Sequence, residues 1–396
     1  MVIVIAIVAG IYIAYPPGTN TVTSTINNTI VQTSINTVTS TNTVTSTTTS
    51  VSISTTATPT YQPLTLQSGG STFVNPIMQV WASGFKDYTS GAVQDNYQAL
   101  GSSAGITGVL KGVFDYAGSD APPSSSVTAN YTAKNGPLLV IPETLGAVAI
   151  FYNVPGVTAS LNLTGPIIAK IYLEKITMWN DPAIQALNPK VSLPANTIIP
   201  VHRSDGSGTT YALTNYFTKV STDWNATGNG FGTTVSWPAA GELGAKGSAG
   251  VAADVSQNPN AIGYADSYYA FSNKLTMAAV QNAAGVFEVP SLAGVTAAAA
   301  AFTAQVQANP TTPITNPPAS ANTAYPVSTY TYLLVYQNQS NQGKGNDIAQ
   351  LFWWIVTHGQ AYGPPLYYPA LPSTVVTIDE NLIAKMNYNG TPFIQA

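Results

Sequence analysis

The sequence predicts a two-domain α/β body that follows an apolar N-terminal segment and a Thr/Ser-rich linker. Three observations lead to this fold class. The chain has 396 residues, which is too many for one ordinary hydrophobic core. Its hydrophobic content of 45% is enough for a well-packed body. From residue 61 onward, apolar strands run repeatedly into turns of small residues and then into helices, which is typical of parallel sheets.

The composition excludes several kinds of function. Only 7% of the residues are charged, against roughly 25% in typical soluble proteins, and the net charge is -4. With no basic stripe, we expect no nucleic-acid partner. The absence of cysteine excludes disulfides, thiolate metal sites and a Cys-linked lipid anchor. The two histidines, His202 and His358, are far apart in sequence, so we expect neither a metal site nor a cofactor.

Residues 1–17 are predicted to be a membrane anchor or a signal. Residues 1–15 are apolar and end at two prolines, but a spanning helix needs about 20 such residues. The segment has neither the basic start of a secretory signal nor a clear Ala-x-Ala cleavage site. We therefore expect an uncleaved anchor or the remnant of a longer one, with a cleaved signal as the alternative.

Residues 18–60 are predicted to form an extended stalk. They are mostly Thr and Ser, and the hexapeptide Asn-Thr-Val-Thr-Ser-Thr occurs three times, at 20–25, 36–41 and 42–47. A segment with so few large apolar side chains cannot offset its ordering entropy by burial. The functional interpretation is an O-glycosylated stalk that lifts a domain off a membrane, and the simpler one is a linker without glycan.

The body begins with alternating strands and helices. A helix is expected over 75–88, because Ile77, Val80, Trp81 and Phe85 recur on one helical face. The expected strands of this part are 64–66, 92–100 and 113–117, and a helix-like stretch ends at residue 110.

The second part of the body continues this pattern. We expect a strand-prone run over 138–153, helices over 167–179, 291–308 and 348–358, and strands over 262–265 and 330–336. A Pro/Asn/Thr-rich connection over 309–326 separates two of these elements.

The stretch 199–211 is predicted to bind an anion. It begins as an apolar strand, breaks at two glycines and enters an amphipathic helix that Ser207 or Thr209 could cap. The free N–H groups of the first turn, with the helix dipole behind them, favour an anion. Arg203 is the only arginine in the chain, and its planar fork suits a bidentate oxyanion contact. The simpler interpretation makes Arg203 only a salt-bridge partner for Asp205.

Six N-glycosylation sequons are consistent with an external protein without establishing one. They lie at Asn27, Asn130, Asn162, Asn225, Asn338 and Asn389.

Several motifs resemble, in order, those of the phosphate-binding proteins of phosphate ABC transporters. They are Gly70-Ser-Thr-Phe73, Tyr97-Gln-Ala-Leu-Gly-Ser-Ser-Ala-Gly105, Val113-Phe-Asp-Tyr-Ala-Gly-Ser-Asp-Ala-Pro122 and Arg203-Ser-Asp-Gly-Ser-Gly-Thr209. The similarity extends to 171–180, 261–264 and 371–376, and covers roughly 62–385.

This resemblance implies a hinged, two-domain, periplasmic-binding-protein-like fold with mixed sheets. Domain I would comprise 61–143 and 325–396, and domain II would comprise 144–324. The resemblance further implies nine phosphate-binding residues at the matching positions: Thr72, Phe73, Ser102, Asp120, Arg203, Asp205, Ser207, Gly208 and Thr209. Among these, Asp205 would hold the Arg203 guanidinium in place.

The expected role of Asp120 has a physical basis. Phosphate keeps at least one proton near neutral pH, whereas sulfate has none. A buried carboxylate can accept a hydrogen bond from the protonated anion but would repel sulfate. Asp120 is therefore predicted to select phosphate, with a helix cap on a surface loop as the alternative.

These observations predict a phosphate receptor without catalytic turnover. It would be a monomer anchored through its N-terminus to the outer face of the cytoplasmic membrane, delivering inorganic phosphate to the permease of an ABC transporter. One alternative is a surface structural or adhesion protein that reuses this fold. A second is a phosphatase-like hydrolase, because 101–105 also matches the Gly-x-Ser-x-Gly nucleophile elbow, with Ser103 activated by His202 or His358. Lys344 belongs to no motif and is expected to be a solvated side chain.

Overall fold

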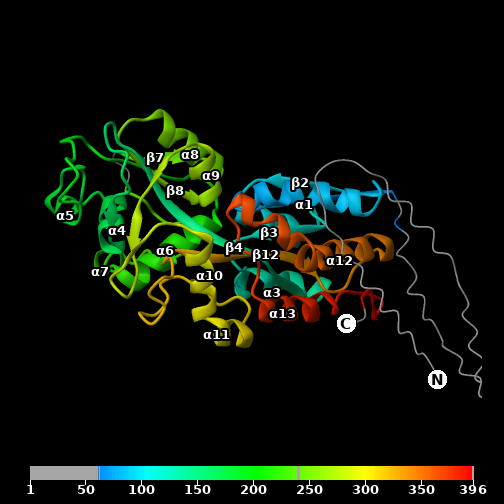
Figure 1. The fold of residues 1–396 in the computed structure, drawn as a ribbon. Coiled ribbons are helices and arrows are strands. Elements are labelled where there is room, and N and C mark those ends of the chain that lie inside the picture. The colour runs from blue at the N-terminus through cyan, green and yellow to red at the C-terminus, as the bar shows by residue number, and fades with distance from the viewer. Residues whose placement is uncertain (1–60, 62, 239–240, 395–396) are drawn as a thin grey trace, which may run out of the picture. The chain divides into compact units, whose positions relative to one another are not determined.

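A computed structural model describes residues 61, 63–238 and 241–394, and Figure 1 shows their arrangement. The predicted anchor (1–17), the predicted stalk (18–60) and Asn27 lie outside the described residues. Within the described ranges, no helix combines the length and the apolar character that crossing a membrane requires.

One mixed sheet organises the fold. Its strands follow the order β2-β1-β3-β12-β4-β8-β6-β7, and β9 (Thr276–Met277) also pairs with β4. The bounds of the other strands in this order are Val93–Ala99, Leu64–Gly70, Tyr116–Ser119, Ser328–Tyr336, Leu138–Asn153, Ala261–Asp266, Ile199–Arg203 and Leu243–Ala245. The neighbours β2, β1 and β3 are parallel, as are β8, β6 and β7, whereas β12 and β4 run antiparallel to their neighbours.

The long strand β4 joins the two parallel groups. It pairs with β12 from Leu138 to Ala147 and with β8 from Val148 to Asn153. Nearly all of its 16 residues are buried, as expected for a strand covered on both faces. The predicted α/β class with a mixed sheet is confirmed.

Helices pack beside both parallel groups (Figure 1). Beside β1, β2 and β3 lie α1 (Asn75–Tyr88), α2 (Ser102–Leu110) and α12 (Gln342–Thr357). Beside β6, β7 and β8 lie α6 (Gly208–Val220) and α8 (Gly247–Gln257).

The remaining described elements are shorter or peripheral. The helices are α3 (Ser125–Asn135), α4 (Gly165–Tyr172), α5 (Pro182–Leu187), α7 (Thr222–Asn225), α9 (Ser267–Ser272), α10 (Leu292–Ala301), α11 (Thr303–Ala308), α13 (Ser373–Ile383), η1 (Gly359–Tyr362) and η2 (Pro364–Leu366). The strands are β5 (Asn162–Leu163), β10 (Ala279–Gln281), β11 (Phe287–Glu288), β13 (Asn387–Tyr388) and β14 (Thr391–Pro392).

Helix α1 forms where the apolar spacing predicted it. Its bounds coincide with the predicted range, and Pro76 occupies its first turn, where the missing N–H has no helical partner to lose. Ile77, Trp81 and Phe85 are buried against the sheet, and each stabilises the fold by about 1.5–3 kcal/mol.

Two predicted ranges in the first half of the body are wrong in their bounds. The strand expected over 113–117 is β3 at Tyr116–Ser119, and Val113 lies in a turn with 65% of its surface exposed. The helix expected over 167–179 ends at Tyr172, because Glu174 adopts a left-handed φ of 54° that a helix cannot continue through. Trp179 is nevertheless buried, from a loop.

Two later helices also differ from the prediction. The helix expected over 291–308 is divided at Phe302 into α10 and α11. The helix expected over 348–358 begins six residues earlier, at Gln342, because the Asn341 side chain caps it by accepting a hydrogen bond from the Lys344 N–H. Helix α8 was not predicted, because its glycine- and alanine-rich sequence has weak apolar periodicity.

Candidate anion-binding site

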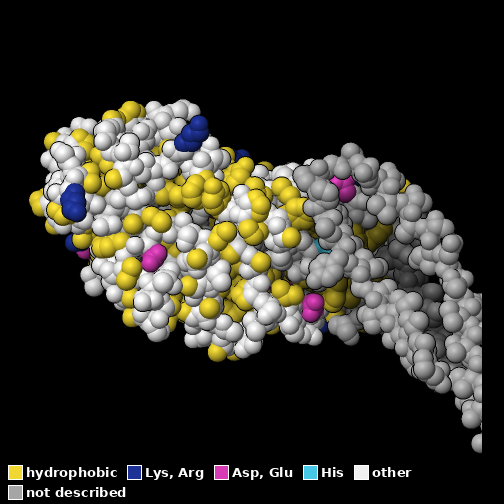
Figure 2. Space-filling model, in the orientation of Figure 1, with side chains coloured by type: hydrophobic (Ala, Val, Ile, Leu, Met, Phe, Trp, Pro, Cys, Tyr) yellow, Lys and Arg dark blue, Asp and Glu magenta, His cyan; other side chains and the backbone are white. Residues whose placement is uncertain are grey.

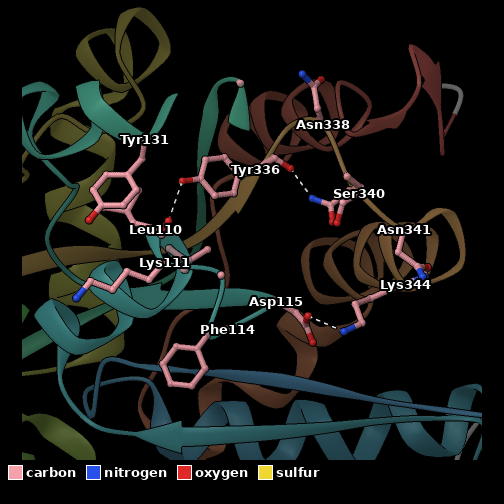
Figure 3. A pocket seen from close by; sticks show the side chains of 14 residues that line it. Leu110, Lys111, Phe114, Asp115, Tyr131, Tyr336, Asn338, Ser340, Asn341 and Lys344 are labelled. Atoms are coloured by element: carbon pink, nitrogen blue, oxygen red, sulfur yellow. Dashed lines mark hydrogen bonds and ion pairs between the residues drawn. The ribbon is translucent and has the colours of Figure 1, made fainter. Parts of the chain in front are cut away.

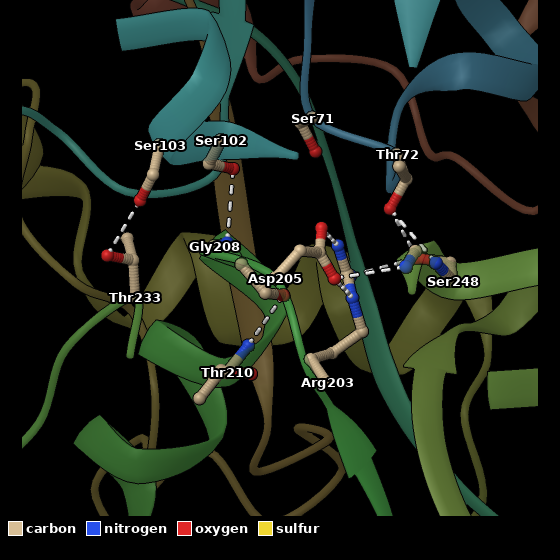
Figure 4. Close-up of polar contacts among 12 residues, drawn as sticks. Ser71, Thr72, Ser102, Ser103, Arg203, Asp205, Gly208, Thr210, Thr233 and Ser248 are labelled. Atoms are coloured by element: carbon tan, nitrogen blue, oxygen red, sulfur yellow. Dashed lines mark hydrogen bonds and ion pairs between the residues drawn. The ribbon is translucent and has the colours of Figure 1, made fainter. Parts of the chain in front are cut away.

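Loops that follow strands on both sides of β4 meet at the hydroxyl of Ser102 (Figure 4). Ser102 begins α2 after β2, and its Oγ accepts hydrogen bonds from the backbone N–H of Gly208 (3.1 Å) and of Asp120 (3.3 Å). Gly208 begins α6 after β6, and Asp120 follows β3. One small side chain therefore brings three of the four predicted binding loops together.

The approach of these loops requires glycine at Gly208. A Cβ added there would lie 2.6 Å from Asp120 Oδ2 and 2.6 Å from Ser102 Oγ, closer than a carbon can come. This close approach explains why the residue that begins α6 is glycine.

Arg203 is held rigidly at the end of β6. Its side chain is 1% exposed, and it donates from Nε to Asp205 Oδ1 (2.7 Å) and from Nη2 to Asp205 Oδ2 (2.6 Å). The backbone N–H of Gly247 also donates to Asp205 Oδ1, at 3.0 Å. Although burial raises the pKa of Asp205, the hydrogen bonds and charge of Arg203 outweigh burial and lower it. The two interpretations of Arg203 are therefore compatible, since its ion pair orients a buried guanidinium beside the predicted site.

Asp120 is buried, with 1% of its surface exposed, and it is not a cap on a surface loop. Its Oδ1 accepts a short hydrogen bond from the Ser71 hydroxyl, while its Oδ2 has no partner among the described residues. Burial raises the pKa of Asp120 to about 7, although the Ser71 hydrogen bond, the charge of Arg203 and Ser102 lower it. Near neutral pH this carboxyl can accept or supply a proton.

Thr209 provides a second unpartnered polar atom. Its side chain is fully buried, and its Oγ1 has no hydrogen-bond partner within the described part of the chain. A buried polar group without a hydrogen bond raises the free energy of the folded state, so the site is suited to a polar ligand. Ser207, not Thr209, caps α6: its Oγ accepts from the Thr210 N–H at 3.1 Å.

Thr72 and Phe73, the two predicted residues of the first loop, are also buried here. The Phe73 N–H donates to Ser71 Oγ at 3.0 Å, and Thr72 Oγ1 accepts from the Ser248 N–H at 3.0 Å. The structure therefore brings all nine predicted residues into one region.

Sequence reasoning missed Ser71 and Ser248. Ser71 lies inside the quoted Gly70–Phe73 motif, so the motif itself could have identified it. Ser248 lies in the first turn of α8, and no local pattern in the sequence indicates that α8 reaches Thr72.

The geometry does not support a hydrolase. The Ser103 hydroxyl donates to Thr233 Oγ1 at 2.9 Å. His202 contacts the Arg203 carbonyl (2.9 Å) and lies 3.5 Å from Glu242, and His358 contacts Thr357. Neither imidazole makes a hydrogen bond to the serine that it would have to activate.

A second cavity, of about 980 Å³, lies away from this site (Figure 3). None of the nine predicted residues lines it. Lys344, expected to be a solvated side chain, instead donates to Asp115 Oδ1 at 2.8 Å in its wall and is about one-third exposed. The described ranges contain no cluster of ligands that could hold a metal ion.

The described sequons differ in exposure. Asn225, Asn338 and Asn389 are exposed, whereas Asn162 is half-buried. Figure 2 shows how sparse the charged side chains are on one face of the body. Hydrophobic side chains, other uncharged side chains and backbone cover most of the described part of that face.

Loops at strand ends that enclose a buried polar site define a solute-binding protein of the α/β class. A family model described as a PBP superfamily domain matches residues 34–357. The phosphate-binding protein PstS of Pasteurella multocida is 37% identical over 318 residues, covering 80% of this chain and 89% of that protein. The phosphate-binding protein PstS of Methanocaldococcus jannaschii is 32% identical over 338 residues, covering 81% and 86%.

Solved structures support the same fold. A phosphate-binding protein from Stenotrophomonas maltophilia has a TM-score of 0.62 at 17% identity, covering 80% of this chain and 93% of that one. The chain therefore belongs to the PBP superfamily and, within it, to the PstS family of phosphate-binding proteins.

Proposed function

We propose that this protein is a receptor that captures inorganic phosphate outside the cytoplasm and delivers it to the permease of an ABC transporter. The observation that carries the proposal is a pair of buried atoms, Asp120 Oδ2 and Thr209 Oγ1, that have no partner among the described residues, together with the charge of Arg203 that acts on Asp120. A protonated tetrahedral oxyanion offers a donor to the carboxylate and acceptors to the hydroxyl and the guanidinium. The names of its PstS relatives support the same ligand.

In this proposal, the nine predicted residues supply the ligand contacts or orient the groups that make them. Backbone N–H groups at the start of α6 and the hydroxyls of Thr72, Ser102 and Thr209 would donate to phosphate oxygens. Arg203 would supply the charged contact, and Asp120 would accept the phosphate proton. Each charge-assisted hydrogen bond is worth about 1.5–3 kcal/mol, so several together give tight binding with one cation.

Phosphate would be held between two closing halves of the body, 61–143 with 325–396 and 144–324. Two observations support this division. The contacts Ser102–Gly208 and Thr72–Ser248 each join one range to the other, and β4 and β12 cross between the strand groups as a connection. Opening would separate the loops and release the ligand.

For the whole protein we propose a monomer held at the outer face of the cytoplasmic membrane by residues 1–17, with residues 18–60 as the stalk and no catalytic turnover. The apolar and Thr/Ser-rich sequences of these segments support this arrangement.

Calorimetric titration of the full chain with phosphate and with sulfate tests the ligand. The proposal expects saturable heat with phosphate and much weaker binding of sulfate. A folded sample that gives no heat with phosphate would instead support a structural role at the surface.

A further inference from the structure

Two pairs of hydroxyl groups join the proposed halves on either side of the site (Figure 4). On one side, Ser103 Oγ donates to Thr233 Oγ1 at 2.9 Å. On the other side, the hydroxyls of Thr72 and Ser248 lie 3.0 Å apart. Ser103, Thr233 and Ser248 are not among the nine predicted ligand residues.

Backbone hydrogen bonds accompany the contact between the Ser103 and Thr233 side chains. The Ser103 N–H donates to the Gly206 carbonyl at 3.1 Å, and the Ser207 N–H donates to the Thr233 carbonyl at 2.8 Å. The loop that carries Thr233 therefore supports the start of α6 on one side and contacts α2 on the other.

Shape complementarity accompanies these hydrogen bonds. A Cβ added to Gly206 would lie 2.3 Å from Ser103 Oγ, and one added to Gly101 would lie 2.4 Å from Asp205 Oδ2. Glycines thus leave the space that allows the two turns to come into direct contact.

The contact on the other side is connected to the charged group of the site. Ser248 Oγ lies 3.5 Å from Arg203 Nη1, and the Ser248 N–H donates to Thr72 Oγ1 at 3.0 Å. Tyr269, from the same half as Ser248, also donates to the Thr72 carbonyl at 3.2 Å.

We propose that the Ser103–Thr233 and Thr72–Ser248 hydroxyl pairs are clasps that set how long the closed, phosphate-loaded state lasts. This inference depends on the proposed function, because the clasps break only if the halves separate. Ser103, Thr233 and Ser248 are positioning residues, since they hold the halves together and do not bind the anion. Their hydrogen bonds form on closing and are lost on opening, so they slow phosphate release and leave the encounter with phosphate unaffected.

The same inference assigns a role to the serine of the Gly-x-Ser-x-Gly match. Ser103 occupies the middle of that motif, and its hydroxyl is engaged with Thr233. Its hydroxyl closes the site and does not attack a substrate.

The test compares Ser103→Ala, Thr233→Val, the double variant and Ser248→Ala with the unmodified full chain. Release of radiolabelled phosphate is followed by rapid filtration after an unlabelled chase, and phosphate and sulfate affinities are measured by calorimetry. Thr234→Val is the matched control, because Thr234 is exposed in the same loop.

Each single variant is expected to release phosphate on the order of 3- to 10-fold faster than the unmodified protein, with an unchanged association rate. The double variant Ser103→Ala/Thr233→Val should release phosphate at the same rate as either single variant, because each substitution removes the same hydrogen bond. The ratio of phosphate to sulfate affinity should stay the same for Ser103→Ala and Thr233→Val.

Release rates that equal those of Thr234→Val would overturn the clasp proposal while phosphate binding itself stands. Additive effects in the double variant would equally overturn it, because the two hydroxyls would then act separately. If the unmodified protein binds no phosphate, the proposed function itself fails, and the two failures are thereby distinguished.

Discussion

The guanidinium of Arg203 and the carboxylate of Asp205 form a two-point ion pair, with Nε–Oδ1 and Nη2–Oδ2 distances of 2.7 and 2.6 Å. The residues are two positions apart, and the Arg203 side chain is almost fully buried. Because the pair fixes the fork in one orientation, Nη1 is directed toward the Ser248 hydroxyl, at 3.5 Å. The protein's one arginine is thus held in a fixed orientation by Asp205.

Replacing Arg203 with alanine is expected to weaken phosphate binding by about 10- to 150-fold, because a buried charge-assisted contact worth about 1.5–3 kcal/mol is lost. Calorimetry measures the affinity, and circular dichroism checks that the fold persists. The Arg203→Lys variant provides a second comparison, because it keeps the positive charge but lacks the planar guanidinium that makes two-point contacts. Unchanged affinity in Arg203→Ala would refute the role of this residue.

Asp120→Asn is expected to narrow the preference for phosphate over sulfate. An amide no longer repels the fully ionised anion, and its N–H₂ can donate to sulfate oxygens. Competition titrations of both anions give the ratio of affinities. A ratio identical to that of the unmodified protein would contradict the proton-sharing role of Asp120.

The stability of the phosphate-free protein is expected to fall as pH rises from about 4 to 8. Burial raises the pKa of Asp120 to about 7 and that of Glu143 to about 8, and it raises the pKa of Asp266 as well. The folded state therefore binds more protons than the unfolded state across this range, and ionisation favours unfolding. For Asp120 alone, the loss between pH 4 and 7 is on the order of 4 kcal/mol.

Urea unfolding at pH 5 and pH 8, without phosphate, measures this change. The Asp120→Asn variant should lose less free energy of unfolding between pH 5 and pH 8, because the side chain at position 120 no longer titrates. A free energy of unfolding that rises with pH would contradict the assignment of these carboxyls as protonated in the folded state.

Gly206→Ala is expected to weaken phosphate binding roughly 10- to 100-fold without unfolding either half. The new Cβ would lie 2.4 Å from Ser103 Cβ, and overpacking of this kind costs about 1–3 kcal/mol in the closed state. Calorimetry reports the affinity, and Ser103→Gly in the same chain should restore part of it. Gly250→Ala is a suitable control, because its nearest neighbour is 3.7 Å away. Normal affinity in Gly206→Ala would show that the turns do not approach as closely as the structure places them.

The α/β class and the composition of the predicted binding loops could be read from the sequence. Strand-to-helix turns with glycine and hydroxyl residues can be recognised locally, because backbone conformation and capping depend on a few neighbouring residues. The resemblance of these turns to a known family predicted Ser102 and Asp120 as ligands, the loop of Arg203 indicated an anion contact, and apolar spacing predicted α1 with its correct bounds.

Which side chains face one another across the site depends on how distant segments pack. Ser248 lies 176 positions from Thr72, and Ser103 lies 130 positions from Thr233. Contacts over such separations arise when the chain packs, and no local spacing encodes them. The raised pKa of Asp120 has the same origin, since burial by distant segments causes it. The end of α4 at Glu174 likewise depends on the backbone conformation there, which the apolar spacing through Trp179 does not reveal.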